Sequence, residues 1–241
     1  MFRKIVNRLS LDDPQHAIRL IAAALFLRPS QEQIYRDLFV RDLAEFGIAD
    51  EYYPLRGAAN YSLLYLLTRI FKEFEVESVL EFGIGQTTVL IDKLAKASGR
   101  TVRLESVEHE EEWKNVIASR VSHQITVAPL TGTGTTYGRQ FYDSKVIPTG
   151  LFQLMVVDGP PADVQGNRFA RNGFADIFAE RLAENFVIIV DDAERKGERS
   201  LIRLVRKALK EAGRTYAEGE ALALKRQKVF CGGDYARAAH F

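Results

Sequence analysis

Apolar and polar positions follow two different periods along the chain. Up to residue 74, apolar side chains recur every three or four positions, which is typical of helices with one buried face. This pattern predicts three helices, "QHAIRLIAAALF" (15–26), "SQEQIYRDLFVRDLAEFG" (30–47) and "NYSLLYLLTRIFKEF" (60–74). Ser30 and Gln33 have capping-box spacing, so the second helix is expected to begin at Ser30.

From residue 77 onward, short apolar runs alternate with amphipathic stretches. The predicted strands are "SVLEF" (78–82), "RLESVE" (103–108), "QITVAP" (124–129), "FQLMVVD" (152–158) and "NFVIIVD" (185–191). The predicted helices are "QTTVLIDKLAKAS" (86–98), "EEEWKNVIASRV" (110–121), "FARNGFADIFAERLA" (169–183) and "RSLIRLVRKALKEA" (199–212). Two β-prone runs after Gly213 are expected to close the sheet as a hairpin. The alternation predicts an α/β fold with a mostly parallel sheet and helices on both faces.

We expect a domain boundary near residue 57, ahead of the helix predicted over residues 60–74. Residues 57–241 are expected to form the α/β domain, and residues 1–56 a helical extension. We expect the extension to cap a substrate cleft or to form a dimer contact. Contact of its basic and apolar start with a membrane surface is a less favoured alternative.

Composition narrows the classes of partner. The 33 Lys and Arg nearly balance the 32 Asp and Glu, so the net charge of +1 provides no field that would attract nucleic acid. The single cysteine, Cys231, excludes an internal disulfide, so a cytoplasmic location is expected. Nucleic acid is therefore not expected as a partner.

The stretch "SVLEFGIGQTTVLI" (78–91) turns from a strand into a helix through two glycines. Gly83 and Gly85 permit unusual backbone angles and close approach of a ligand, and a helix beginning at Gln86 favours a carboxylate or phosphate at its N-terminus. Glu108 ends the next predicted strand, 23 residues after Gly85, where a carboxylate can bind both ribose hydroxyls. A plain tight turn is the alternative.

The pairing fits either a nicotinamide dinucleotide or S-adenosylmethionine. A dinucleotide fingerprint has a third small residue where this chain has Thr88. Glu81 precedes the glycines; it either contacts the ligand or binds its own loop.

"VLEFGIGQTT" followed by "SVE" resembles motif I and the following acidic position of class I S-adenosylmethionine-dependent methyltransferases. The resemblance covers about residues 57–232 and implies a Rossmann-like, seven-stranded sheet. It implies cofactor contacts from Glu81, Gly83, Gly85, Gln86, Thr87, Glu108, His109 and Asp158. Trp113 either flanks the adenine with His109 or is a helix core residue.

Three carboxylates, Asp158, Asp191 and Asp192, follow two strands that are neighbours in that family's order. They resemble the acids of metal-dependent small-molecule O-methyltransferases, which implies a catalytic site with a divalent cation such as Mg²⁺. The catechol enzymes carry a lysine base where this chain has Pro160, so the base is unassigned. Without a metal, Asp191 or Asp192 could serve as the base. Alternatively, Asp191 caps a helix together with Glu194.

Substrate contacts are expected beside these acids. Residues 130–145, "LTGTGTTYGRQFYDSK", form a Gly- and Thr-rich loop. Its Tyr137, Phe141 and Tyr142 could stack on a sugar or an aromatic ring; alternatively, they pack the loop onto the sheet. "VVDGPP", the basic "NRFARNGF" and "VDDAERKGE" together resemble bacterial sugar- and polysaccharide-directed methyltransferases and the plant glucuronoxylan methyltransferases. This resemblance implies that Arg168 and Arg171 hold a substrate carboxylate or phosphate; alternatively, they form salt bridges with the nearby acids or lie in solvent.

Together these features predict S-adenosylmethionine-dependent methyl transfer to a hydroxyl of a small molecule or saccharide, with or without a divalent metal. An NAD(P)-dependent oxidoreductase and a non-catalytic scaffold of the same fold remain as alternatives. A homo-oligomer formed through the N-terminal helices is a further expectation.

Overall fold

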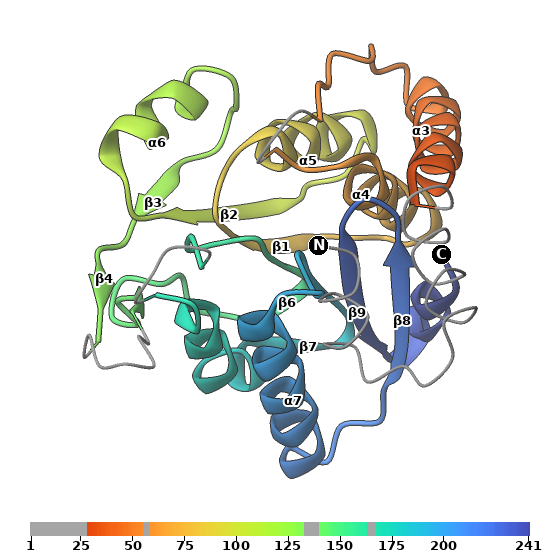
Figure 1. Ribbon diagram of the computed structural model, residues 1–241. Helices are drawn as coiled ribbons and strands as arrows, with labels where there is room; N and C mark the ends of the chain where they lie inside the picture. Colours follow the sequence, from red (N-terminus) through yellow and green to blue (C-terminus); the bar gives the residue numbers. More distant parts are fainter. Residues whose placement is uncertain (1–27, 55–57, 133–139, 163–166) are drawn as a thin grey trace, which may run out of the picture.

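The computed structural model describes residues 28–54, 58–132, 140–162 and 167–241 (Figure 1). The helix expected over residues 15–26 lies outside these ranges, and so does Tyr137. In the part of the chain that is described, no helix combines the length and apolar character needed to cross a membrane.

A seven-stranded sheet forms the centre of the molecule (Figure 1). Its strand order is β3-β2-β1-β6-β7-β9-β8, and the order reverses between β1 and β6. The strands from β3 to β7 are parallel, whereas β9 runs antiparallel to both β7 and β8. The bounds are β1 Ser78–Phe82, β2 Arg103–Glu108, β3 Ile125–Val127, β6 Phe152–Val157, β7 Leu182–Val190, β8 Ala217–Leu222 and β9 Arg226–Gly232. The Rossmann-like sheet and its closing hairpin are therefore confirmed.

Helices cover both faces of this sheet, because its strands are apolar on both sides. The helical bounds are α3 Arg28–Glu45, α4 Tyr61–Glu73, α5 Gln86–Ala97, α6 Glu111–Ala118, α7 Lys196–Glu211, η2 Ala170–Asp176, η3 Ala179–Arg181 and η4 Gly233–His240, the η elements being 3-10 helices. On β1, Val79 packs with α4 and α5, whereas Leu80 and Phe82 pack with η2 and α7. Alternating strand residues thus fill two separate cores.

The predicted α-helix over residues 169–183 is wrong. The segment forms the short 3-10 helices η2 and η3, and β7 begins already at Leu182. Asn172 and Gly173 are poor helix formers. A Cβ on Gly173 would lie 2.3 Å from the Cβ of Phe141, so the backbone of η2 is pressed against its neighbour. Packing against Phe141 therefore outweighs the helical pattern of apolar residues in this segment.

Residues 130–145 hold a small two-stranded sheet, formed by β4 Leu130–Thr131 and β5 Phe141–Tyr142. Phe141 and Tyr142 are buried against Phe82 of β1. Within the described residues, the end of this loop is therefore packed onto the main sheet rather than exposed.

Helix α3 packs along α4 and extends the core on that face of the sheet (Figure 1). Phe39 and Leu43 of α3 are fully buried there. The described helix already includes Arg28 and Pro29, so the helix start expected at Ser30 is wrong, and the side chain of Gln33 donates to Asp37.

Candidate functional site

A cavity of about 830 Å³ opens at the carboxyl ends of β1, β2 and β6, where the strand order reverses. Ligands bind at this position in open α/β sheets. The lining includes Gly85, Glu108, Trp113, Tyr142, Asp158 and Arg171. One cavity therefore joins the glycine corner, the acid that ends β2 and the acid that follows β6.

The two glycines of the corner have different surroundings. Gly83 has φ +82°, and a Cβ on it would lie 2.7 Å from the backbone nitrogen of Gly159. A Cβ on Gly85 would meet no atom within 4 Å, and Gly85 lines the cavity. Gly83 is therefore required by close contact between two loops, and Gly85 leaves room for a ligand.

Thr88 stabilises the start of α5. Its hydroxyl accepts a hydrogen bond from the backbone N–H of Gly85 at 2.8 Å. Gly85, Gln86 and Thr87 line the cavity, which brings the N-terminus of α5 to its wall. The first amides of a helix have no acceptor within it, so this end favours an anionic group.

Glu81 lies beneath the glycine corner and is 1% exposed. Its carboxylate accepts hydrogen bonds from the hydroxyls of Thr87 at 2.6 Å and Ser106 at 3.0 Å. Burial raises the pKa of Glu81 to about 7. Glu81 is not among the residues that line the cavity, so the structure places it as a support of the corner, and its predicted cofactor contact stays a prediction.

Glu108 reaches the cavity at the end of β2. Its carboxylate accepts hydrogen bonds from the backbone N–H groups of His109 at 2.7 Å, Glu110 at 3.1 Å and Ile84 at 3.4 Å. These bonds fix the carboxylate beside the glycine corner. His109 also lines the cavity.

Trp113 of α6 forms one wall of the cavity beyond Glu108. Its indole N–H donates to the carbonyl of Ile84 at 2.9 Å, and 42% of the residue is exposed. The ring is thus held at the rim of the cavity rather than in the core.

The three predicted acids come together as expected. Asp158, Asp191 and Asp192 each offer a carboxylate oxygen, and these atoms lie within 4.8 Å of one another. The backbone of Asp192 has φ +56°, a left-handed conformation that is uncommon outside glycine and is often found at functional sites. The alternative capping role is absent, because α7 begins only at Lys196 and Glu194 accepts from the backbone N–H of Arg226.

Cationic side chains lie between these acids. Lys225, in the β8–β9 turn, contacts Asp191 at 3.1 Å and Asp192 at 3.4 Å. Arg195 contacts Asp192 at 2.8 Å. Arg171 contacts Asp158 and Asp192, each at 3.3 Å. The acids predicted as metal ligands are therefore already paired with fixed cations.

The three acids differ in the direction in which their pKa is shifted. Burial and repulsion by Asp191 raise the pKa of Asp158 well above its usual value. Burial would raise the pKa of Asp191 as well, but Lys225 and a hydrogen bond from Gln227 at 2.6 Å outweigh it and lower that pKa. The side chain of Asp158 is also the most accessible of the three, at 23% exposure. Asp158 is thus the acid best placed to exchange a proton with a ligand.

Tyr142 faces the same part of the cavity. Its hydroxyl is buried and has no hydrogen-bond partner among the described residues. Burial raises the pKa of Tyr142 well above 10, so the hydroxyl remains a donor. The hydroxyl is therefore available to donate to a ligand or a water molecule in the cavity.

The two predicted substrate arginines lie in different places. Arg171 lines the cavity but is buried, and its guanidinium also donates to the carbonyl of Pro160 at 3.1 Å. Arg168 is exposed and is not part of the cavity lining. The structure therefore does not bring them together as a clamp, and Arg195 is the accessible arginine on this wall.

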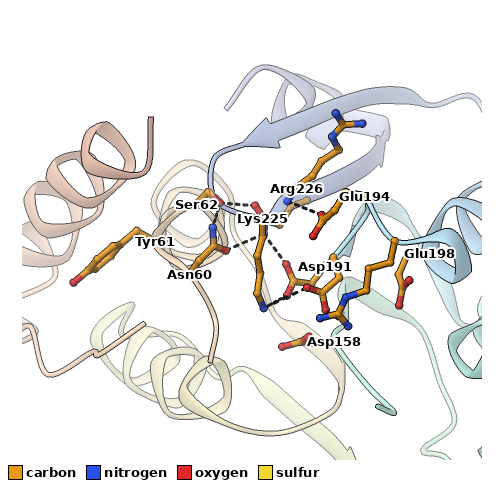
Figure 2. A network of polar contacts seen from close by, with 12 residues as sticks. Asn60, Tyr61, Ser62, Asp158, Asp191, Glu194, Glu198, Lys225 and Arg226 are labelled. Atoms are coloured by element: carbon orange, nitrogen blue, oxygen red, sulfur yellow. Dashed lines mark hydrogen bonds and ion pairs between the residues drawn. The ribbon is translucent and has the colours of Figure 1, made fainter. Parts of the chain in front are cut away.

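Several site residues were not anticipated, because they come from distant segments. Asn60, just before α4, lies beside Ser62 (Figure 2) and donates to it at 2.7 Å. Gln227 donates to Asn60 at 2.9 Å and also to Asp191. Lys225 and Gln227 lie beside Asp191 because β9 is antiparallel to β7, with Lys228 opposite Val190. No local sequence signal marks this pairing.

Tyr53 was also not anticipated as a cavity residue. Its backbone N–H donates to Gln86 at 2.9 Å, and the Gln86 side chain donates back to the carbonyl of Tyr53 at 2.8 Å. Both residues line the cavity, and 71% of Tyr53 is exposed. Gln86, predicted to bind cofactor, thus also holds the segment before residue 57 at the cavity mouth.

No family model and no curated protein sequence matches the chain. Among solved structures, a methyltransferase from Pyrococcus furiosus is similar over 84% of this chain and 96% of its own, with 17% identity and a TM-score of 0.48. An O-methyltransferase from Bacillus cereus in complex with SAH is similar over 89% of this chain and 97% of its own, with 14% identity and a TM-score of 0.45. Precorrin-6y C5,15-methyltransferase from Geobacter metallireducens GS-15 follows, at 80% and 97% coverage, 9% identity and a TM-score of 0.47. At such identities and scores, function has to be argued from the residues of this chain.

Proposed function

We propose that this chain binds S-adenosylmethionine in the cavity and transfers its methyl group to a hydroxyl of a small molecule or saccharide. The observation that carries the proposal is the single cavity that joins Glu108, after the glycine corner, to Asp158 and Tyr142. A carboxylate suited to a ribose and a carboxyl suited to accept a proton therefore line one cavity at the reversal of strand order.

The cofactor half of the cavity is suited to a nucleoside with a carboxylate. Glu108 is held where a carboxylate can accept from ribose hydroxyls, and the N-terminus of α5 favours the carboxylate of the methionine part. Trp113 and Ile117 supply an apolar wall for the adenine. A dinucleotide fingerprint has a small residue at the position that Thr88 occupies here. Thr88 is instead fully buried and caps α5.

The acceptor half is suited to a hydroxyl. When bound, S-adenosylmethionine supplies a methyl group on a positively charged sulfur. Asp158, with its raised pKa and exposed edge, would accept the proton of the hydroxyl that is methylated. Tyr142 would donate a hydrogen bond that orients the acceptor.

We also propose that the segment 1–56 serves as a cap over the cavity. The support is the pair of hydrogen bonds between Tyr53 and Gln86 at its mouth.

Formation of S-adenosylhomocysteine with a panel of hydroxyl compounds tests the function. Asp158→Asn should lower turnover at least about a hundredfold, the contribution of a positioned base. Asp37→Asn, on the exposed surface of α3, is the matched control and should be unchanged. If no compound is methylated and the protein binds NAD instead, the proposal is wrong.

A further inference from the structure

Asp158, Asp191 and Asp192 form an acidic cluster. It differs from a metal site because cationic side chains lie between its carboxylates. The side chain of Lys225 points to Asp191 (Figure 2). Its ammonium lies 3.1 Å from Asp191 and 3.4 Å from Asp192, so one cation bridges two acids. Arg171 bridges Asp158 and Asp192 from the other side. Lys225 thus joins Asp191 to Asp192, and Arg171 joins Asp158 to Asp192. A divalent ion would have to join the same pairs of acids.

The ammonium is held in place by the fold. The carbonyl of Lys225 accepts from the backbone N–H of Ala223 at 2.9 Å, which closes the β8–β9 turn. Immediately after it, the backbone N–H of Arg226 donates to Glu194 at 3.0 Å. The side chain of Lys225 is 16% exposed, and that of Asp191 is fully buried. Lys225 therefore cannot swing away without breaking a buried ion pair, which is costly.

Charge balance leads to the same conclusion. Four carboxylates gather here, because Glu198 lies 3.6 Å from Arg171 and joins the three aspartates. Three cations, Arg171, Arg195 and Lys225, oppose them. With all groups ionised, the cluster has one net negative charge, too little to offset a divalent ion. Loss of Lys225 would leave two, the charge that such an ion neutralises.

We propose that Lys225, with Arg171, takes the place of a divalent cation in this cluster, and that the removal of its ammonium opens a divalent-cation site on Asp191 and Asp192. Lys225 is then a positioning residue: it holds the two buried acids, while Asp158 remains available to a ligand. The proposal also implies that the reaction runs without a metal, and this part rests on the proposed methyl transfer. The effect of Lys225 on divalent-cation binding does not depend on that function.

Mn²⁺ binding, measured from the loss of the free-ion electron paramagnetic resonance signal, tests the proposal. The wild-type protein should bind no Mn²⁺ tighter than about 1 mM, the weak end for carboxylate sites. Lys225→Met should bind at least about tenfold tighter, because one positive charge a few ångströms from the ion is lost. Lys225→Arg keeps the charge and should bind no better than wild type.

Lys207→Met is the control, because Lys207 lies on the exposed side of α7 and pairs with a single carboxylate, Glu211, away from the cluster. It should leave Mn²⁺ binding unchanged. In Lys225→Met, a second change, Asp191→Asn, should remove the gained affinity.

Two results would overturn the proposal. One is micromolar Mn²⁺ binding by wild-type protein that Asp192→Asn abolishes, a measurement that does not depend on whether Lys225→Met folds. The other is a folded Lys225→Met variant with no gain in affinity. Failure of the proposed function would instead appear as an absence of S-adenosylhomocysteine formation, with Mn²⁺ binding unaffected.

Discussion

The glycine corner allows a strong test, because its two glycines should fail for different reasons. A Cβ on Gly83 would lie 2.7 Å from the nitrogen and 2.8 Å from the Cα of Gly159. Neither loop can move away freely, since Gly83 donates to the carbonyl of Val107 at 3.0 Å and Asp158 donates to that of Phe82 at 2.9 Å. Gly83→Ala must therefore strain the backbone or break these bonds.

Two costs add for Gly83→Ala. A side chain at φ +82° costs roughly 1–2 kcal/mol. Overpacking of a filled contact costs roughly 1–3 kcal/mol more. We expect a loss of about 2–5 kcal/mol in the free energy of unfolding, or about 4–20 °C in Tm for a chain of this size.

Urea and thermal unfolding of the ligand-free protein measure this loss. Gly85→Ala is the matched control: its Cβ meets no atom within 4 Å, so only the helix-cap preference is lost, at about 1 kcal/mol. Gly85→Ala should instead weaken binding of S-adenosylhomocysteine, because its methyl group enters the cavity. Equal stability losses in the two variants, or none in Gly83→Ala, would refute the assigned roles.

Two further predictions concern buried groups near the corner. Because burial raises the pKa of Glu81 from 4.5 to about 7, the folded state binds its proton more tightly than the unfolded state. The protonated Glu81 therefore contributes its whole stabilising effect below about pH 4.5. The free energy of unfolding falls by about 3 kcal/mol as the pH rises through about 7. Glu81→Gln should remove that part of the fall, measured by urea unfolding at pH 5 and pH 8; an unchanged pH dependence would contradict it. Tyr142→Phe should keep stability or raise it by about 1 kcal/mol, because the lost hydroxyl has no partner in the described structure, while methyl transfer slows. A clear loss of stability with unchanged turnover would show that the hydroxyl is structural.

The sheet could be predicted because its signals are local. The strand β1, Ser78–Phe82, was predicted with its observed bounds, and Gln86 begins α5 as expected. Glycines, apolar runs and strand-ending acids lie within a few residues of the structure they specify. The region of η2 failed for the opposite reason, since contact with Phe141 decides its conformation.

The candidate site was predictable only in part. Glu108, Asp158, Asp191 and Asp192 are found at strand ends because topology alone brings such positions to one edge. Lys225 and Gln227 could not be foreseen, because they reach Asp191 through the register of an antiparallel strand 34 or more residues away. The sequence thus identifies the acids and Arg171 beside them, but not Lys225.

The central claim is that Glu108 holds the ribose of an S-adenosyl cofactor beside Trp113, the single tryptophan of the chain. Titration with S-adenosylhomocysteine, followed by calorimetry and by Trp113 fluorescence, tests it most directly. We predict one saturable site whose affinity falls at least about tenfold in Glu108→Ala, as expected for the loss of hydrogen bonds to a charged group. Glu105→Ala, on the same strand and outside the cavity lining, should bind as wild type does. Binding that is absent in the wild type, or equal in Glu108→Ala and wild type, would contradict the account.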